Sequence, residues 1–177
     1  MRKNNKRADI LQAALSVVEE HGAGHLTIDA VAAQSGFSKG GVLYHFATKK
    51  ALISGMLEYL IESSRQRIDA HTEKFGSDQP LKALLQVENR MTDTERRASL
   101  AIVAAAAEDP ELLSPARDYI KDLVGQITSQ SDDPTAAIVH YLANEGLRFL
   151  DIFELNPMNT EQNNQVVAYL SQKAEEL

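Results

Sequence analysis

Apolar residues recur at spacings of three and four along almost the whole 177-residue chain. That spacing is the period of an amphipathic α-helix, whereas the strict alternation that marks a half-buried strand is scarce. The sequence therefore predicts an all-α protein of about nine helices. Hydrophobic residues make up 44% of the chain and charged residues 24%, which is typical of a folded globular protein rather than a disordered one.

Three shorter helices and one long helix are expected in the N-terminal part. The first spans about 5–20 and ends at a glycine-containing segment. Thr27 and Ser38 are good N-caps for the second and third helices, because their hydroxyl oxygens can accept from the first backbone N–H groups. Thr48 caps in the same way a long fourth helix that runs over about 49–75.

Five further helices are expected beyond the fourth. A leucine-rich helix follows Pro80, and the segment 94–108, nearly apolar in its second half, predicts a buried central helix. Ser114-Pro115 and Asp133-Pro134 each pair an N-cap with a proline at the first helical position, which opens two more helices. The last helix begins near Glu161.

Charge is distributed unevenly over the chain. The net charge is −7, yet residues 1–50 hold seven Lys and Arg against four Asp and Glu, which leaves residues 51–177 with a charge of −10. A basic head on an acidic body is expected if only the head meets phosphates. On charge alone, chance clustering of lysines remains the other interpretation.

Several of the basic residues lie at the start of the chain: Arg2, Lys3, Lys6 and Arg7. They are expected either to form a flexible arm that adds salt-dependent affinity for DNA or to be a solvated tail.

Composition and motifs exclude several classes of protein. The chain has no cysteine, so disulfides, cysteine-bound zinc and thiol catalysis are excluded, and a cytoplasmic location is the default. No membrane span or signal peptide is expected. The body has no metal-ligand spacing, phosphate loop or nucleophile elbow, so we expect no enzyme, no metal and no cofactor. His71 and His140 are expected to be ordinary core or surface residues.

Residues 27–46 carry the most informative pattern. Two short helices joined by a tight turn at Gly36 and braced by a third predict a helix-turn-helix. The second helix of that motif presents its N-terminal residues to base edges in the major groove of DNA. Lys39 can donate to guanine, and the glycines that follow it let the backbone approach DNA closely.

Over residues 7–60 the chain resembles the DNA-binding domain of the tetracycline-repressor (TetR) family. The motif S-x-G-x-x-x-Y-H-F-x-(S/T)-K-x-x-L is present as Ser38, Gly40, Tyr44, His45, Phe46, Thr48, Lys49 and Leu52, after an upstream pattern of Thr27, Ile28, Val31, Ala32 and Gly36. The resemblance implies a two-fold dimer with an effector pocket in the C-terminal body. It further implies that Thr27, Tyr44 and Lys49 contact phosphates, while Ser38, Lys39 and Gly41 lie in the groove.

Two positions depart from the family pattern. Lys50 stands where an acidic residue is usual and is therefore expected to offer a phosphate contact, and Gly41 stands where threonine is frequent. His45 has two equal interpretations, a phosphate contact or a packing residue. The expected DNA-binding residues are Thr27, Ser38, Lys39, Gly40, Gly41, Tyr44, His45, Thr48, Lys49 and Lys50. The expected core residues of the motif are Ile28, Val31, Val42, Leu43 and Phe46.

The body, residues 51–177, is expected to bind an effector and to dimerise, with residues 1–50 as the DNA-binding domain. The last two helices carry apolar stripes that could pair with their two-fold mates as a four-helix bundle. The expected lining of the effector pocket is Met56, Tyr59, Ser63, Met91, Val103, Ala107, Tyr119, Leu123 and Glu145.

Glu145 interrupts the apolar stripe of the helix that begins at Pro134. A carboxylate on that face costs free energy if it is buried without a partner. One interpretation is that it meets a cationic effector. The favoured interpretation is an ion pair, for example with Arg148 across a dimer.

The sequence thus predicts a homodimeric, ligand-responsive DNA-binding regulator, a repressor that a small molecule releases from double-stranded operator DNA. The alternative is a DNA-bound adaptor whose body binds a protein partner, which an exposed apolar groove in place of an enclosed cavity would favour. The identities of the operator and the effector do not follow from the sequence.

Overall fold

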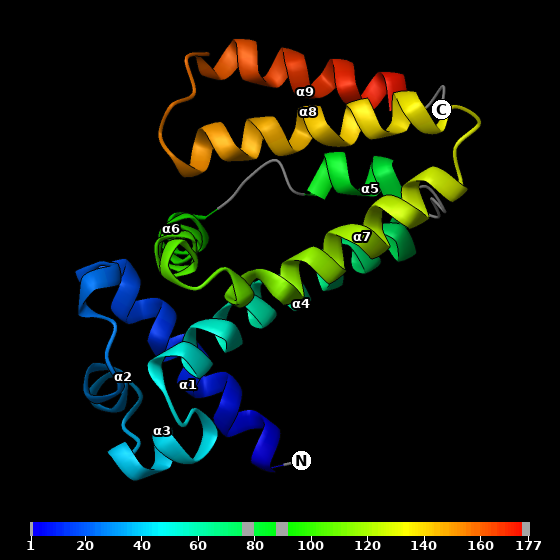
Figure 1. Ribbon diagram of the computed structural model, residues 1–177. Coiled ribbons are helices and arrows are strands. Elements are labelled where there is room, and N and C mark those ends of the chain that lie inside the picture. The colour runs from blue at the N-terminus through cyan, green and yellow to red at the C-terminus, as the bar shows by residue number, and fades with distance from the viewer. Residues whose placement is uncertain (1, 76–79, 88–91, 175–177) are drawn as a thin grey trace. The chain divides into compact units, whose positions relative to one another are not determined.

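The computed structural model describes residues 2–75, 80–87 and 92–174, and Figure 1 traces them in chain order. Over these residues the chain forms nine α-helices and two short 3₁₀ turns, with no strand, which confirms the predicted all-α class. The elements are α1 (Arg2–His21), η1 (Ala23–His25), α2 (Ile28–Ser35), α3 (Lys39–His45), α4 (Lys49–Phe75), α5 (Pro80–Val87), α6 (Asp93–Glu108), η2 (Pro110–Leu113), α7 (Ser114–Ser129), α8 (Pro134–Ile152) and α9 (Thr160–Ala174). None of the helices in the described ranges is both long and apolar enough to cross a membrane.

The predicted caps set the starts of the N-terminal helices. The hydroxyl oxygens of Thr27, Ser38 and Thr48 each accept a hydrogen bond, 3.0–3.1 Å long, from the backbone N–H three residues further on. Gly36 ends α2 with φ +71°, a left-handed conformation that favours glycine. Residues within one helical turn of Gly36 and Ser38 therefore determine the turn between α2 and α3, as predicted.

The start of the first helix differs from the prediction. Helix α1 begins at Arg2, so the expected flexible arm is wrong for Arg7. The Arg7 guanidinium lies 2.7 Å from the Glu58 carboxylate and 5.2 Å from the centre of the Phe46 ring. The contact with the Phe46 ring and the ion pair with Glu58 hold this partly exposed side chain against the fold.

The helices α6 and α7 also begin differently from expectation. Thr92 and Glu95 form a reciprocal capping box at the start of α6. Ser114 has helical φ and ψ because the 3₁₀ turn η2 leads directly into α7, so it is not an N-cap. Nor is α6 buried all round: it buries Ala98, Ala101, Ile102 and Ala106, while the opposite face, with Val103 and Ala107, is exposed.

The described chain divides into two compact units. The first comprises residues 1–62 and 92–117, and the second comprises residues 63–91 and 118–177. The first unit therefore extends beyond the 1–50 segment: it adds the start of α4, and it adds α6, which packs against α1.

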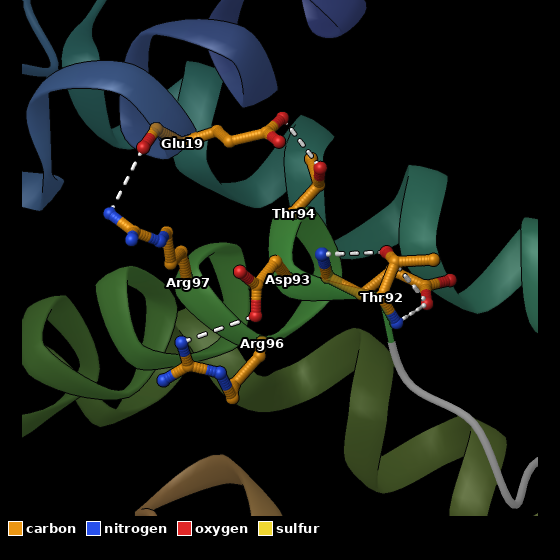
Figure 2. Close-up of polar contacts among 7 residues, drawn as sticks. Glu19, Thr92, Asp93, Thr94, Arg96 and Arg97 are labelled. Atoms are coloured by element: carbon orange, nitrogen blue, oxygen red, sulfur yellow. Dashed lines mark hydrogen bonds and ion pairs between the residues drawn. The ribbon is translucent and has the colours of Figure 1, made fainter.

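Polar contacts at the C-terminal end of α1 secure α6 in the first unit (Figure 2). The Thr94 hydroxyl donates to the Glu19 carboxylate over 2.5 Å, and the Arg97 guanidinium donates to the Glu19 carbonyl oxygen over 3.0 Å. Apolar packing lies beside them, with one cluster joining the buried faces of α1, α2, α3, α4 and α6. The helices that carry the predicted DNA-binding residues thus share one core with α6.

The second unit has its own core. Its buried residues are Leu81, Leu84, Leu85, Leu123, Ile127, Ala137, Tyr141, Leu147, Leu170 and Ala174. Within this unit α5 packs against both α8 and α9, which also contact each other. Asn144 of α8 is fully buried, and neither polar atom of its amide has a hydrogen-bond partner in the described structure.

Candidate nucleic-acid interface

The helix-turn-helix is held by a small apolar core. Val31 of α2 and Val42 of α3 are fully buried, and Phe46, directly after α3, is 2% exposed. Ile28 is half-buried against the same cluster. Leu43 is 37% exposed, so its predicted core role is wrong. It follows Val42 by one position, which on a helix rotates it about 100° away from the buried face.

The predicted DNA-binding residues lie on the outer side of this core. Tyr44 is 70% exposed, although an aromatic ring of that size usually finds a buried place. Its ring meets the half-buried His45 ring edge to face, with 5.2 Å between centroids. Gly41 is half-buried, and the remaining exposed members of the predicted set are Thr27, Ser38, Lys39, Gly40, Thr48, Lys49 and Lys50.

Two of the predicted lysines already contact carboxylates of the same chain. The Lys39 ammonium lies 2.9 Å from Asp29 of α2. The Lys50 ammonium pairs with Asp109, which lies between α6 and η2. This hydrogen bond from Lys50 is the main cause that holds the pKa of the Asp109 carboxyl below its ordinary value of 3.8. Sequence reasoning assigned Lys50 to phosphate alone because nothing local in the sequence connects it to Asp109.

Gly55 is a position that sequence reasoning missed. A Cβ atom built there would lie 2.6 Å from a ring carbon of Phe46 and 3.2 Å from a methyl carbon of Leu11. Real Cβ atoms essentially never lie within 3.0 Å of such an atom, so the 2.6 Å contact with Phe46 is not possible without a shift. The absence of a side chain at Gly55 therefore lets the ring of Phe46, the residue directly after α3, pack against α4.

The residues predicted for the effector pocket are divided between the two units. Met56 is fully buried in the first unit, where the Tyr59 hydroxyl lies 2.5 Å from the Gln12 amide nitrogen. Val103 and Ala107 lie on the exposed face of α6 in the same unit. Met91 lies outside the described residues.

Ser63, Tyr119 and Leu123 lie in the second unit. Ser63 accepts a 3.4 Å hydrogen bond from Arg67 one turn along α4. Tyr119 and Leu123 line a hollow of about 170 Å³ between α4 and α7. The complete lining of this hollow is Arg65, Ile68, Asp69, Tyr119, Asp122, Leu123 and Gln126.

A cation–aromatic contact shapes the hollow. The Arg65 guanidinium carbon lies 5.1 Å from the centre of the Tyr119 ring, within the range of a cation–π interaction. The Tyr119 hydroxyl lies 3.3 Å from the Ser64 hydroxyl. Asp69 and Asp122 complete a lining with two carboxylates and one guanidinium.

Glu145 forms an ion pair within its own helix. Its carboxylate lies 3.2 Å from the Arg148 guanidinium, three residues further along α8, and both side chains are partly buried. The contact is of the kind that the ion-pair interpretation predicts, although it lies within one chain instead of across a dimer.

The fold and this exposed helix-turn-helix define the class of a DNA-binding regulator rather than an enzyme. Residues 10–56 match the N-terminal domain described as "Bacterial regulatory proteins, tetR family". Residues 78–175 match the "Tetracyclin repressor-like, C-terminal domain". The chain belongs to the TetR family of DNA-binding transcriptional regulators.

Relatives support the same assignment at two levels. The nucleoid occlusion factor SlmA of Marinomonas is 34% identical over 68 residues, which are 38% of this chain and about a third of that protein's length. A TetR family member from Streptomyces coelicolor has a TM-score of 0.72 at 24% identity, over 93% of this chain and 97% of its own. The multidrug binding protein EbrR, solved with ethidium, has a TM-score of 0.69 at 23% identity, over 95% of this chain and 99% of its own. At these identities the two structures show the shared fold alone.

Proposed function

We propose that this chain is a homodimeric repressor that binds operator DNA through α2, α3 and the start of α4 and is released by a small-molecule effector. The observation that carries the proposal is the outer surface of the helix-turn-helix. There a tyrosine that is 70% exposed stands beside hydroxyl and ammonium groups, above a tightly packed apolar core.

These exposed groups suit the sugar–phosphate backbone and the major groove. Hydroxyl and ammonium groups such as those of Tyr44, Thr48 and Lys49 hold phosphates and fix the register of a protein on DNA. The short helix α3 would then present Ser38 and Lys39, at its N-terminal end, to base edges. Gly40 and Gly41 add no side chain that would hold the helix backbone away from the groove.

Apolar side chains on α8 and α9 support a homodimer. The exposed large apolar residues of α8 follow a helical spacing of three, seven and four: Val139, Leu142, Phe149 and Phe153 just beyond its end. On α9, Tyr169 is also exposed and Val166 is at the limit of exposure. An unpaired apolar stripe of this length is typical of an association surface. A two-fold pairing of α8 and α9 with the same helices of a second copy would cover it.

The hollow in the second unit is the proposed effector site. Two carboxylates, a tyrosine ring and a guanidinium already seated on that ring favour a planar, aromatic monocation. EbrR, which shares this fold, was solved with ethidium, a ligand of that chemical class. At about 170 Å³ the hollow suits a ligand the size of one substituted ring. Glu145 does not line this hollow, so its role in binding an effector stays a prediction from the sequence.

In the proposed mechanism, effector binding shifts a population between two arrangements of the dimer. Recognition helices must lie one DNA turn apart to enter successive major grooves. A ligand that binds better to an arrangement with another spacing lowers the affinity for DNA by the same factor by which DNA lowers the affinity for the ligand.

DNA binding is tested by selection from a random-sequence library, followed by fluorescence-anisotropy titration of the selected duplex. Tyr44→Phe and Lys49→Gln should each weaken binding, while Lys121→Gln, the same change at an exposed position of α7, should bind like the parent chain. If no sequence is enriched, or if Lys49→Gln and Lys121→Gln behave alike, the proposed DNA surface is wrong.

Effector binding is tested with benzamidinium, a planar aromatic monocation, against its neutral analogue benzamide. Calorimetry should detect benzamidinium with the parent chain, a weaker signal with Asp122→Asn and none with benzamide. The bound cation should also release the selected DNA. Equal binding of the two compounds would contradict the charge argument. Binding of neither compound, with intact DNA binding, would favour the adaptor whose body takes a protein partner.

A further inference from the structure

The surface proposed to face DNA contains a carboxylate that DNA phosphates should repel. Asp29 lies in the first turn of α2, and Lys39 lies in the first turn of α3. The Lys39 ammonium is 2.9 Å from one carboxylate oxygen of Asp29 and 3.0 Å from the other. It therefore straddles the carboxylate, and the pair joins the two helices of the motif at their N-terminal ends.

Stability of the fold does not account for this pair. Its side chains are 60% and 70% exposed, and exposed ion pairs contribute little because water screens them. A carboxylate in the first turn of α2 favours that helix, but a lysine in the first turn of α3 opposes the dipole of its own helix. The pair is therefore better explained by an interaction with a bound partner, here DNA, than by stabilisation of the fold.

We infer that Asp29, acting through Lys39, is a specificity-determining residue for DNA recognition. This inference rests on the proposed binding of DNA through α2 and α3. On DNA of arbitrary sequence, Asp29 cancels the charge that Lys39 offers to phosphates, so one fewer counterion is released and binding is weaker. The carboxylate therefore weakens binding to every sequence that does not donate a hydrogen bond to it.

A matching operator offsets this loss through hydrogen bonds at the base edges. Lys39 keeps one N–H donor, which the O6 and N7 acceptors of guanine can share, while Asp29 can accept from the N4 amino group of cytosine. The pair presents a donor at the start of α3 and an acceptor at the start of α2, 2.9 Å apart, at the edge where α3 would enter the groove. The pair should therefore recognise a guanine and a nearby cytosine together. Lysine alone would read the guanine and bind phosphates indiscriminately.

The test compares Asp29→Asn with the parent chain on selected operator DNA and on random-sequence DNA. The variant should bind random DNA more tightly, with a salt slope steeper by about 0.9. Its advantage on random DNA should therefore shrink about threefold between about 50 and 200 mM salt. Loss of the cytosine contact should lower the ratio of operator to random affinity by roughly fivefold or more.

Two further variants separate this role from a general effect of charge. Glu20→Gln makes the same change in net charge at an exposed position near the end of α1, and it should leave the specificity ratio unchanged. In a Lys39→Met background, Asp29→Asn should no longer lower the ratio of operator to random affinity, because Asp29 acts on base recognition through its pair with Lys39.

The outcomes are distinct from those that test DNA binding itself. If the parent chain selects an operator but Asp29→Asn keeps the same specificity ratio and salt slope, the role of Asp29 is overturned while DNA binding stands. An effect equal to that of Glu20→Gln, or undiminished by Lys39→Met, overturns it as well. If the parent chain selects no DNA, the proposed function fails first.

Discussion

Replacing Gly55 by alanine tests whether the close packing of Phe46 on α4 positions the DNA-binding helices. The added Cβ would meet a ring carbon of Phe46 at 2.6 Å, and the ring cannot easily move because Phe46 is 2% exposed. Overpacking of this kind costs about 1–3 kcal/mol. Alanine is better than glycine in a helix by roughly 0.5–1 kcal/mol, which offsets part of the cost.

The net expectation is a loss of up to about 2.5 kcal/mol in the free energy of unfolding, which lowers Tm by up to about 10 °C in a chain of this length. Gly125→Ala is the matched control, since a Cβ at Gly125 of α7 meets nothing within 4 Å. That variant should raise Tm by about 1–4 °C. Both are measured by thermal unfolding at one protein concentration, because an oligomer's Tm depends on concentration.

The double variant Gly55→Ala/Phe46→Leu identifies the cause. Leucine lacks the ring carbon that the new Cβ meets, so the two substitutions should cost less together than the sum of their separate effects. The reasoning is refuted if Gly55→Ala stabilises the chain as Gly125→Ala does. Strict additivity of the double variant would refute it too.

Three further predictions follow from other positions. Gly146 lies on the exposed α8 stripe, where an added Cβ meets nothing within 4 Å, so Gly146→Leu should leave the monomer folded but prevent its dimerisation in sedimentation. The control Gly125→Leu should still dimerise, and a Gly146→Leu variant that remains a dimer would show that α8 is not in the interface. Asn144→Leu should unfold at an equal or higher temperature than the parent, since an unpartnered buried amide costs about 1–3 kcal/mol, and a large loss of stability would mean that the amide is bonded in the native state. The pKa of Asp109 is lowered in the folded state, so the stabilisation from its pair with Lys50 is complete above the unfolded pKa and is lost as the pH falls through the lower folded value. Asp109→Asn and Lys50→Met should both flatten the loss of Tm below about pH 4, and a difference between the two variants would mean that another group causes it.

The local signals in the sequence were enough to predict the helices and the recognition motif. Thr27, Ser38 and Thr48 form the predicted caps because a cap depends only on residues within one turn. Gly36 ends α2 for the same reason. The pattern of apolar residues likewise placed Val31, Val42 and Phe46 in the core.

What the sequence left open depends on contacts between distant segments. Lys50 and Asp109 meet across 59 positions of chain, and Gly55 reveals its role only once Phe46 is placed against it. The alanine run of α6 predicted complete burial, yet alanine is compatible with exposed helix positions and only one face is covered. The division of the expected pocket residues between two units has the same origin.

The packing of α6 in the first unit has a consequence for folding during synthesis. The helices that carry the helix-turn-helix are made within the first 50 residues, but the apolar face of α1 that α6 covers waits for residues 93–108. During synthesis from the N-terminus, the first unit is complete only once residue 117 has left the ribosome. A fragment cut after residue 62 would leave that face of α1 uncovered, which favours aggregation.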